Sequence, residues 1–362
     1  MKKRIGVITM YRRNYGAFLQ AYALQKKLIC LGYEAELIRY DYYKDRAIFE
    51  VPLIHMRNPI KFCREIAVAI LRTKQKKQRV MAFDKSIKRN LRESDKYYRT
   101  EREMEKDPPI YDIYLTGSDQ VFNPFLSPQA YRSRMLSFAC RQPGRKVSYA
   151  ASIGLKKYPE QHTGFFIDAL NKFDALSVRE QEAVRMINQL TGKKVEQHID
   201  PCFLLSRDEW IDFLSGSPFP KEPYILFYMV QKQQRVIDYA KALSKKTGLP
   251  VFSVDGRGSF SNSVSLPFPS PESFVASFLN AKYVVTNSFH GTAFSILFHK
   301  KAHIVLPDTG SERILNILEN CDLMRLLDNE MIGFEEDGYA AADQYLEKER
   351  KRSEDYLKGI GE

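Results

Sequence analysis

Strand-like and helix-like segments alternate along almost the whole chain of 362 residues. Short apolar runs without polar alternation, such as residues 5–8 and 284–285, are typical of parallel strands that are covered on both faces. Segments of helical length separate these runs. Helices that connect parallel strands wind a sheet in the right-handed sense and cover its faces. The sequence therefore predicts an α/β protein with Rossmann-like sheets.

The length of the chain indicates two domains, because one hydrophobic core rarely grows this large. The stretch Ser215–Pro223 contains three prolines and no periodic pattern, so it is the best candidate for a linker. We expect an N-terminal Rossmann-like domain over residues 1–216 and a C-terminal one over 217–362, facing each other across a cleft. The last helix, at about 340–357, is expected to pack back on the first domain.

The expected elements follow the same alternation on both sides of this linker. Strands are expected at 5–9, 35–40, 112–116, 146–151, 175–178, 194–199, 224–230, 250–254, 283–287 and 303–306. Helices are expected at 15–31, 160–172, 180–190, 232–246, 271–280, 291–299 and 311–320. Gly32, just past the first helix, is a plausible C-terminal cap.

Positive charge is concentrated in one segment of a chain whose formal net charge is +12. Residues 57–106 hold 16 Lys and Arg against 7 Asp and Glu, a net of +9. We expect two helices here, inserted into the first domain. Three interpretations stay open: a solvated insertion, a surface that docks on an anionic membrane, and a nucleic-acid site. Nucleic acid is the least favoured, because the segment has no known nucleic-acid module and few interleaved aromatic residues.

Composition excludes several classes of protein and indicates a compartment. No apolar run reaches the roughly 20 residues of a membrane helix, and the apolar run near the N-terminus is too short for a signal peptide. The five cysteines are scattered, without the paired spacing of a metal site or a disulfide framework. We therefore expect a cytoplasmic protein, which the basic segment would hold peripherally at the inner face of the membrane, and no metal.

The tripeptide Phe289-His290-Gly291 lies between a β-branched strand and an apolar helical run. Ligands of open α/β sheets bind at the carboxyl ends of strands, and helix N-termini favour anions. His290 is therefore placed to handle an anionic substrate, although a histidine that only fills the turn is the plain alternative. The remaining histidines lack a carboxylate or cysteine at metal-ligand spacing, and we interpret them as structural or superficial.

Two loops at strand ends of the first domain are unusually polar. One holds Asn14, Tyr15 and Gly16, where the glycine would let a ligand approach the helix. The other, residues 116–124, offers Ser118, Asp119, Gln120 and Asn123, a set that can bind sugar hydroxyls or simply shape an Asx turn. Neither loop is a GxGxxG or Walker fingerprint.

Charged residues follow later strands as well. Arg179 leaves a strand end and begins a helix, where a guanidinium can clamp a phosphate or carboxylate; a surface pair with Glu180 or Glu182 is the alternative. His290 and Arg313 flank successive strand–helix units of the second domain. Asp200 precedes a proline, which more often shapes a turn.

Six segments in register resemble the polysaccharide pyruvyl transferase family along nearly the whole chain. They are Asn14–Ala17 with Leu19–Gln25, Gly117–Pro124, Tyr149–Gly154, Leu176–Glu180, Asp200-Pro201 with Leu204-Leu205, and Ser288–Thr292. Each segment is weak by itself, and the shared order makes chance unlikely.

The resemblance implies a fold similar to that of two-domain, GT-B-type glycosyltransferases. It also implies phosphoenolpyruvate as donor and a saccharide as acceptor, often polyprenyl-linked and destined for capsule, exopolysaccharide or cell wall. Arg179 and His290 match donor-binding positions, with His290 as the acid–base residue. Many members carry Arg-Leu or Arg-Phe directly before the His-Gly pair, where this chain has Ser288-Phe289.

The expected donor site therefore comprises Arg179, Ser288, His290, Gly291 and Arg313, with Arg313 near the place where other members have a lysine. The expected acceptor site comprises Asn14, Tyr15, Gly16, Ser118, Asp119, Gln120 and Asn123. Phosphoenolpyruvate is a co-substrate, and neither a cofactor nor a metal is expected. Two other hypotheses remain: a glycosyltransferase that uses a nucleotide sugar, and a non-catalytic relative that has lost donor binding through the change at Ser288.

Overall fold

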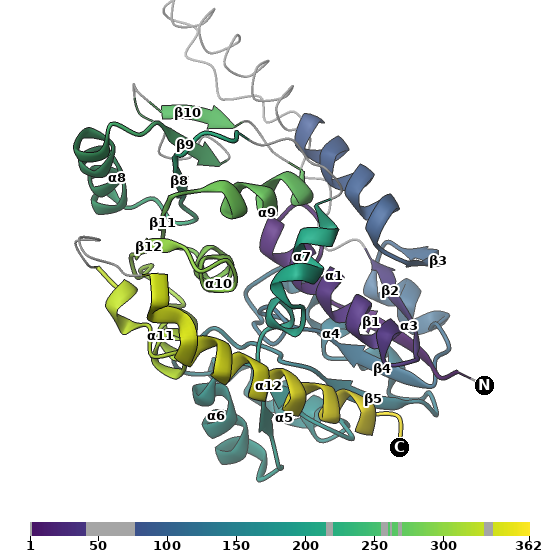
Figure 1. The fold of residues 1–362 in the computed structure, drawn as a ribbon. Helices are drawn as coiled ribbons and strands as arrows, with labels where there is room; N and C mark the ends of the chain where they lie inside the picture. Colours follow the sequence, from purple (N-terminus) through teal and green to yellow (C-terminus); the bar gives the residue numbers. More distant parts are fainter. Residues whose placement is uncertain are drawn as a thin grey trace, which may run out of the picture.

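Two separate five-stranded sheets organise the chain (Figure 1). The computed structural model describes residues 2–40, 77–214, 220–254, 260, 263–266, 270–328 and 336–362. The strand orders are β3-β2-β1-β4-β5 and β10-β9-β8-β11-β12, and neighbouring strands run parallel in both sheets. This is the doubly wound arrangement. The predicted α/β class, with two Rossmann-like sheets, is confirmed.

The first sheet is built around β1 (Arg4–Ile8), which pairs with β2 (Glu34–Tyr40) and β4 (Ile113–Thr116). The outer strands are β3 (Glu93–Tyr98) and β5 (Arg145–Ser148). Helix α1 (Tyr15–Cys30) joins β1 to β2, and the side chain of Asn14 caps it by accepting from the amide of Ala17. The helix ends at the expected place, because Gly32 adopts φ 95°, which favours glycine.

A small parallel pair of strands extends the first domain. Strands β6 (Ser177–Val178) and β7 (Glu196–Gln197) pair with each other, and single bridges link Val147 to Ala175 and Ala151 to Val178. The chain segments that follow β6 and β7 therefore emerge at the same edge. The other elements of this domain are α3 (Glu101–Lys106), η1 (Pro128–Ala130), α4 (Tyr131–Arg134), η2 (Ser137–Ala139), α5 (Glu160–Leu170), α6 (Gln181–Thr191), η3 (Pro201–Leu204) and α7 (Arg207–Phe213).

The second sheet has β8 (Ile225–Tyr228) and β11 (Tyr283–Thr286) at its centre, where apolar side chains are buried on both faces. The other strands are β9 (Val251–Val254), β10 (Ser263–Leu266) and β12 (Lys301–Ile304). The helices are α8 (Gln234–Thr247), α9 (Pro271–Asn280), α10 (Phe289–Leu297) and α11 (Glu312–Asn320), followed by the short turns η4 (Met324–Leu326) and η5 (Glu336–Tyr339). The proposed boundary between residues 216 and 217 falls within 215–219, outside the described residues.

Two strands differ from the sequence-based expectation. The basic segment 57–106 was expected to be helical, but its described part contains a helix at 77–90, then β3, then the short α3. Strand β3 carries four polar or charged residues before its two tyrosines, and such a composition is unusual for a strand. Both β3 and β10 lie at sheet edges, where only one neighbour supplies pairing and burial is incomplete. Residues 57–76 lie outside the described part of the chain.

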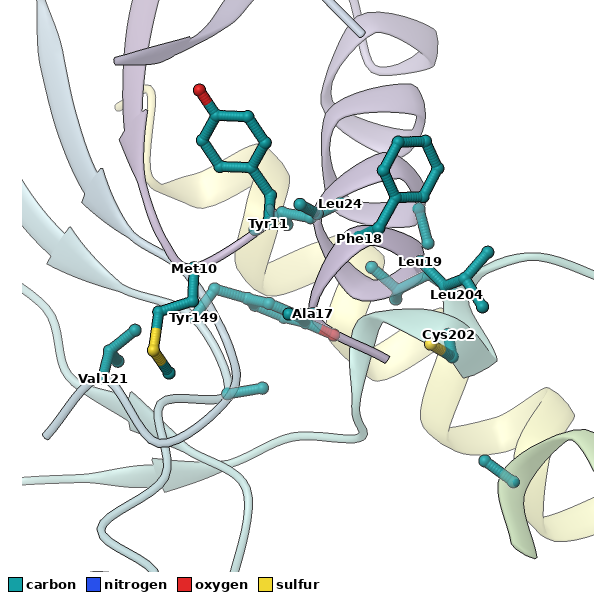
Figure 2. Close-up of a cluster of buried hydrophobic side chains, with 14 of the residues drawn as sticks. Met10, Tyr11, Ala17, Phe18, Leu19, Leu24, Val121, Tyr149, Cys202 and Leu204 are labelled. Atoms are coloured by element: carbon teal, nitrogen blue, oxygen red, sulfur yellow. The ribbon is translucent and has the colours of Figure 1, made fainter. Parts of the chain in front are cut away.

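The main core joins α1 to the end of β1 and to η3. Figure 2 shows Met10 and Tyr11 beside Ala17 and Phe18 of α1, with Cys202 and Leu204 of η3 approaching the same helix. All of these side chains are buried. The turn that follows β7 is therefore fixed by apolar packing directly beneath the N-terminal end of α1.

Helix α9 of the second domain packs against α1 and the helix at 77–90. The rings of Tyr15 and Phe274 are stacked with their centroids 4.6 Å apart. Glu272, which is 4% exposed, accepts hydrogen bonds of 2.7 Å from both Ser86 and Asn90. The inserted segment therefore contacts the second domain directly.

The last helix, α12 (Ala340–Gly359), extends from the second domain across the first (yellow in Figure 1). At its start, the hydroxyl of Tyr339 donates to the carbonyl of Lys300 at 2.6 Å. Near its end, the hydroxyl of Tyr356 donates to the carbonyl of Ser148 at 2.8 Å. Along the described ranges, no helix has both the length and the apolar character of a membrane span.

Candidate active site

His290 lies in the first turn of α10, at the carboxyl end of the central strand β11. The helix begins two residues earlier than the sequence indicated. Ser288 is its N-cap, and the Ser288 hydroxyl accepts from the amide of Gly291 at 3.3 Å. A Cβ on Gly291 would collide with Thr286, so this glycine allows α10 to approach β11 closely. Ser288 and Gly291, two of the five predicted donor-site residues, therefore shape the turn that holds His290.

The imidazole of His290 reaches across to the first domain. A Cβ added to Gly16 would lie 2.5 Å from Cγ of His290 and closer still to Nδ1 and Cε1. The open side of Gly16, which we expected a ligand to use, is thus occupied by the His290 ring. His290 is 8% exposed, and its buried Nε2 has no hydrogen-bond partner among the described residues.

Arg179 follows β6 and is 5% exposed. Its Nη1 forms an ion pair with Asp200, and its Nε lies 3.8 Å from the carboxylate of Glu180. Within the described residues, neither Nε nor Nη2 has a hydrogen-bond partner. These two nitrogens form the side-on edge of the guanidinium, which binds a carboxylate or phosphate in a bidentate manner.

Arg313, on α11, brings a second guanidinium to the same place. The aromatic ring of Phe289 lies 4.6 Å from the guanidinium carbon of Arg179 and 5.8 Å from that of Arg313. Burial, followed by the charge of Arg179, lowers the pKa of Arg313. Its Nε is buried without a hydrogen-bond partner, and no salt bridge is found for it within the described ranges. Two neighbouring cations whose buried donors lack partners among the described residues have the chemistry to bind an anion.

Asp200 is a residue whose role in the site the sequence did not reveal. It caps η3 through the amide of Cys202 at 3.0 Å, as a turn-shaping aspartate does. It also accepts from the Ser118 hydroxyl at 3.1 Å and pairs with Arg179. Burial alone would raise the pKa of Asp200, but Arg179 and then His290 outweigh burial and lower it. Asp200 is therefore an ionised carboxylate at the centre of the site.

The surrounding charges set the protonation of His290. Burial lowers its pKa, and the carboxylates of Asp200 and Asp119 oppose that effect. The guanidinium groups of Arg179 and Arg313 lower it further. At neutral pH the imidazole is therefore neutral, and an anion that neutralises the two arginines will raise its pKa.

Asp200, Cys202 and His290 place ligand atoms within 4.8 Å of one another, a spacing that a metal ion can use. The surroundings do not suit a cation, because Arg179 already occupies the Asp200 carboxylate and Arg313 lies near. Burial raises the pKa of the Cys202 thiol well above its ordinary value, whereas a metal ligand must be a thiolate. The chemistry of this cluster fits an anion better than a metal.

The predicted acceptor residues divide into two groups. Ser118 is fully buried and donates to Asp200 within the first domain, whereas Tyr15 is buried in the stack with Phe274 and supports the interface between the domains. Asp119 adopts φ 68° and remains partly exposed beside the charged cluster. A non-glycine residue in this region is strained, which is common at functional sites.

The remaining acceptor candidates hold the loop together. The amide of Asn123 donates to the side chain of Gln120 at 2.9 Å and accepts from the amide of Phe125 at 3.0 Å. Asn14 caps α1, the helix that follows β1. Their roles in acceptor binding stay predictions.

A cavity of about 130 Å³ adjoins the two arginines between η3, α11 and α12. Its lining includes Arg179, Arg313 and Phe289, and also polar residues that sequence reasoning missed: His198, Asn316, Asn320 and Arg352. The missed residues are on helices or after β7, far apart in the chain, and no local motif marks them. The cavity is much smaller than the roughly 300–1,000 Å³ of pockets that hold drug-sized ligands.

Known structures of similar overall arrangement are distant. The chain matches the UDP-GlcNAc 2-epimerase of Methanocaldococcus jannaschii, in complex with UDP-GlcNAc and UDP, at 12% identity and a TM-score of 0.48, covering 97% of this chain and 94% of that one. The UDP-GlcNAc 2-epimerase of Neisseria meningitidis bound to UDP-GlcNAc matches at 11% identity and a TM-score of 0.48, covering 99% of this chain and 94% of that one. Arabidopsis thaliana UGT89C1 complexed with UDP-L-rhamnose matches at 10% identity and a TM-score of 0.48, covering 100% of this chain and 99% of that one.

Comparison with family models gives a direct assignment. No curated protein sequence matches the chain at a significant level. The family model for polysaccharide pyruvyl transferase matches residues 14–309. This range begins at the N-cap of α1 and includes Arg179, Asp200 and His290. Arg313 and the residues of α12 that line the cavity lie outside it. The chain belongs to the polysaccharide pyruvyl transferase family.

Proposed function

We propose that this transferase forms a pyruvate ketal on a saccharide, with phosphoenolpyruvate as the donor. One observation carries the proposal: Arg179 and Arg313 lie beside the same Phe289 ring, line the same cavity, and hold buried nitrogens without hydrogen-bond partners among the described residues. Both charges also act on His290, whose pKa is lowered. Phosphoenolpyruvate has a carboxylate and a phosphate, so it needs two such cations in a site of low dielectric constant. The small cavity next to both arginines suits a compact anion better than a nucleotide sugar.

The proposed reaction begins with proton transfer to the methylene carbon of the enol phosphate. His290 supplies this proton after the donor's negative charge has raised its pKa. A sugar hydroxyl attacks the resulting oxocarbenium-like carbon, phosphate leaves, and a second hydroxyl closes the ring. The two hydroxyls lose two protons in total: one replaces the proton given to carbon and the other balances the released phosphate. The arginines stabilise the charge on the leaving phosphate.

The test is phosphate release from phosphoenolpyruvate in the presence of a panel of polyprenyl-linked and free saccharides, with the ketal identified by mass spectrometry. His290→Asn should lower turnover by roughly 10²–10⁴-fold while phosphoenolpyruvate still raises the melting temperature. Protection by UDP-sugars alone would favour a glycosyltransferase. No thermal shift with phosphoenolpyruvate in the wild type would favour a non-catalytic relative.

We further propose that the acceptor is lipid-linked and that the protein works in the cytoplasm, at the inner face of the membrane, in capsule or exopolysaccharide synthesis. The helix at 77–90 supports this. It buries Phe83 and Ile87 on one side, while its other side exposes Met81, which is 70% exposed, among basic residues. The exposed basic residues are Lys77, Lys85, Lys88 and Arg89. Such a face complements anionic lipid headgroups.

Sedimentation with vesicles tests the membrane proposal. Binding to vesicles with anionic lipid should exceed binding to neutral vesicles and should fall as salt rises. Lys85→Glu/Lys88→Glu should weaken binding, while Lys245→Glu/Lys246→Glu on α8 serves as a control with equal charge change. Equal recovery on neutral and anionic vesicles at low salt contradicts the proposal. Tight, salt-sensitive DNA binding would instead support the nucleic-acid alternative.

A further inference from the structure

Asp200 connects the groups that both domains bring to the site. Its carboxylate is 1% exposed and has three partners: Arg179, the Ser118 hydroxyl at 3.1 Å, and the amide of Cys202 at 3.0 Å. All three partners lie in the first domain, and together they fix the direction of the carboxylate. The fourth neighbour, His290, comes from the second domain.

The ion pair determines which edge of Arg179 is available. Asp200 occupies Nη1, and among the described residues Nε and Nη2 have no hydrogen-bond partner, although the carboxylate of Glu180 lies 3.8 Å from Nε. The ring of Phe289 covers one face of the group at 4.6 Å. A guanidinium held at one end and on one face can rotate little. The rigid pair thus presents a preorganised fork, which lowers the entropy cost of binding an anion.

The same carboxylate acts on His290. Asp200, Cys202 and His290 have ligand atoms within 4.8 Å, yet no hydrogen bond joins Asp200 to the imidazole. The other charged groups that act on the ring are Asp119 from the loop after β4, Arg179 after β6, and Arg313 on α11. Of these, Asp200 is the buried anion, so its field is the least screened by solvent.

We propose that Asp200 is the positioning residue of this active site: it orients the free edge of Arg179 toward the anionic donor and supports the proton on His290. This inference rests on the proposed function for its kinetic part and on the geometry alone for its effect on His290. The competing interpretation is that Asp200 is an internal anion that occupies Arg179 and must be displaced by the donor. The two interpretations predict opposite changes in donor affinity.

The first measurement needs no substrate. The ring of His290 is titrated by NMR in the wild type and in Asp200→Asn, with His290→Asn to assign the signal. Loss of the carboxylate removes an attraction and leaves Arg179 unbalanced, so the pKa of His290 should fall. Ser118→Ala removes a partner of the same oxygen but keeps the charge, so its pKa change should be smaller. An unchanged pKa in Asp200→Asn overturns the role toward His290.

The second measurement separates orientation from competition. If Asp200 positions Arg179, Asp200→Asn should raise KM for phosphoenolpyruvate on the order of 10²-fold, as expected when one member of a buried charge pair is removed. Tighter binding of phosphoenolpyruvate in this variant would overturn the proposal in favour of competition. If the wild type transfers no pyruvyl group, the proposed function fails, and the NMR titration still decides whether Asp200 acts on His290.

A variant that folds poorly would not end the test. Removing both charges, in Arg179→Gln/Asp200→Asn, leaves neither member of this pair as a buried charge without its partner and should recover part of the lost stability. The pKa of His290 should then be lower in this double variant than in Arg179→Gln, where Asp200 acts without its partner. Equal values in the two variants overturn the proposal.

Discussion

Gly16→Ala should impair closure of the two domains around His290. The added methyl carbon would lie 2.5 Å from Cγ of His290 and closer to two other ring atoms. Carbon atoms in contact are separated by roughly 3.5–4.0 Å, so the ring or the helix that carries it must retreat by about 1 Å. Overpacking of this kind costs roughly 1–3 kcal/mol. If the strain acts only when the domains are closed, the equilibrium constant for closure should fall about 5- to 150-fold.

The assay is kcat/KM for phosphate release, together with hydrogen exchange of the amides at the starts of α1 and α10. The variant should lose kcat/KM by up to the same factor, and those amides should exchange faster. Gly164→Ala is the matched control, because a Cβ at this position in α5 meets nothing within 4 Å. Wild-type kcat/KM in Gly16→Ala, or an equal loss in Gly164→Ala, would refute the reasoning.

Three further predictions concern charge. Arg179→Lys keeps the charge but loses the side-on edge of the guanidinium, so kcat/KM should fall by the equivalent of roughly 2–4 kcal/mol. Steady-state kinetics like those of the wild type would contradict this prediction. Donor binding should raise the pKa of His290 and take up a proton, so affinity should weaken as pH rises through the pKa of the complex; calorimetry in buffers of different ionisation enthalpy should give different heats. Burial, followed by Arg352, lowers the pKa of His198 to about 3, against about 6.5 when unfolded. The unfolded state therefore binds the extra proton, and the free energy of unfolding should fall below pH 6.5, by about 2 kcal/mol at pH 5. The pH dependence of melting should be flatter in His198→Gln.

The central strands could be predicted from sequence because burial on both faces leaves an unmistakable pattern. Strands β1 and β8 consist almost entirely of buried apolar residues, and β11 has two buried valines at its centre. The edge strands β3 and β10 have no such pattern. Only tertiary pairing with β2 makes Glu93–Tyr98 a strand, and pairing partners distant in sequence are invisible to a local pattern.

The same distinction explains the site. His290 and Arg179 were recognisable because each follows a strand directly. The role of Asp200 in the site could not be recognised, because its partner Arg179 follows the preceding strand. An Asp-Pro pair is also sufficiently explained by the turn that it forms. The sequence predicted that a ligand approaches the open side of Gly16, whereas in the structure the His290 ring, from a helix more than 270 residues away, occupies that side.

Helix α12 has a consequence for the order of folding. Among the described elements it is synthesised last, yet Tyr356 bonds to the end of β5 and Lys27 of α1 pairs with Glu354 at 2.7 Å. The first domain therefore completes its surface only after the second has been made. During synthesis, the surface of the first domain that α12 covers stays exposed to chaperones and proteases until α12 has been made. A chain that stops before residue 340 would leave the protein in that unfinished condition permanently.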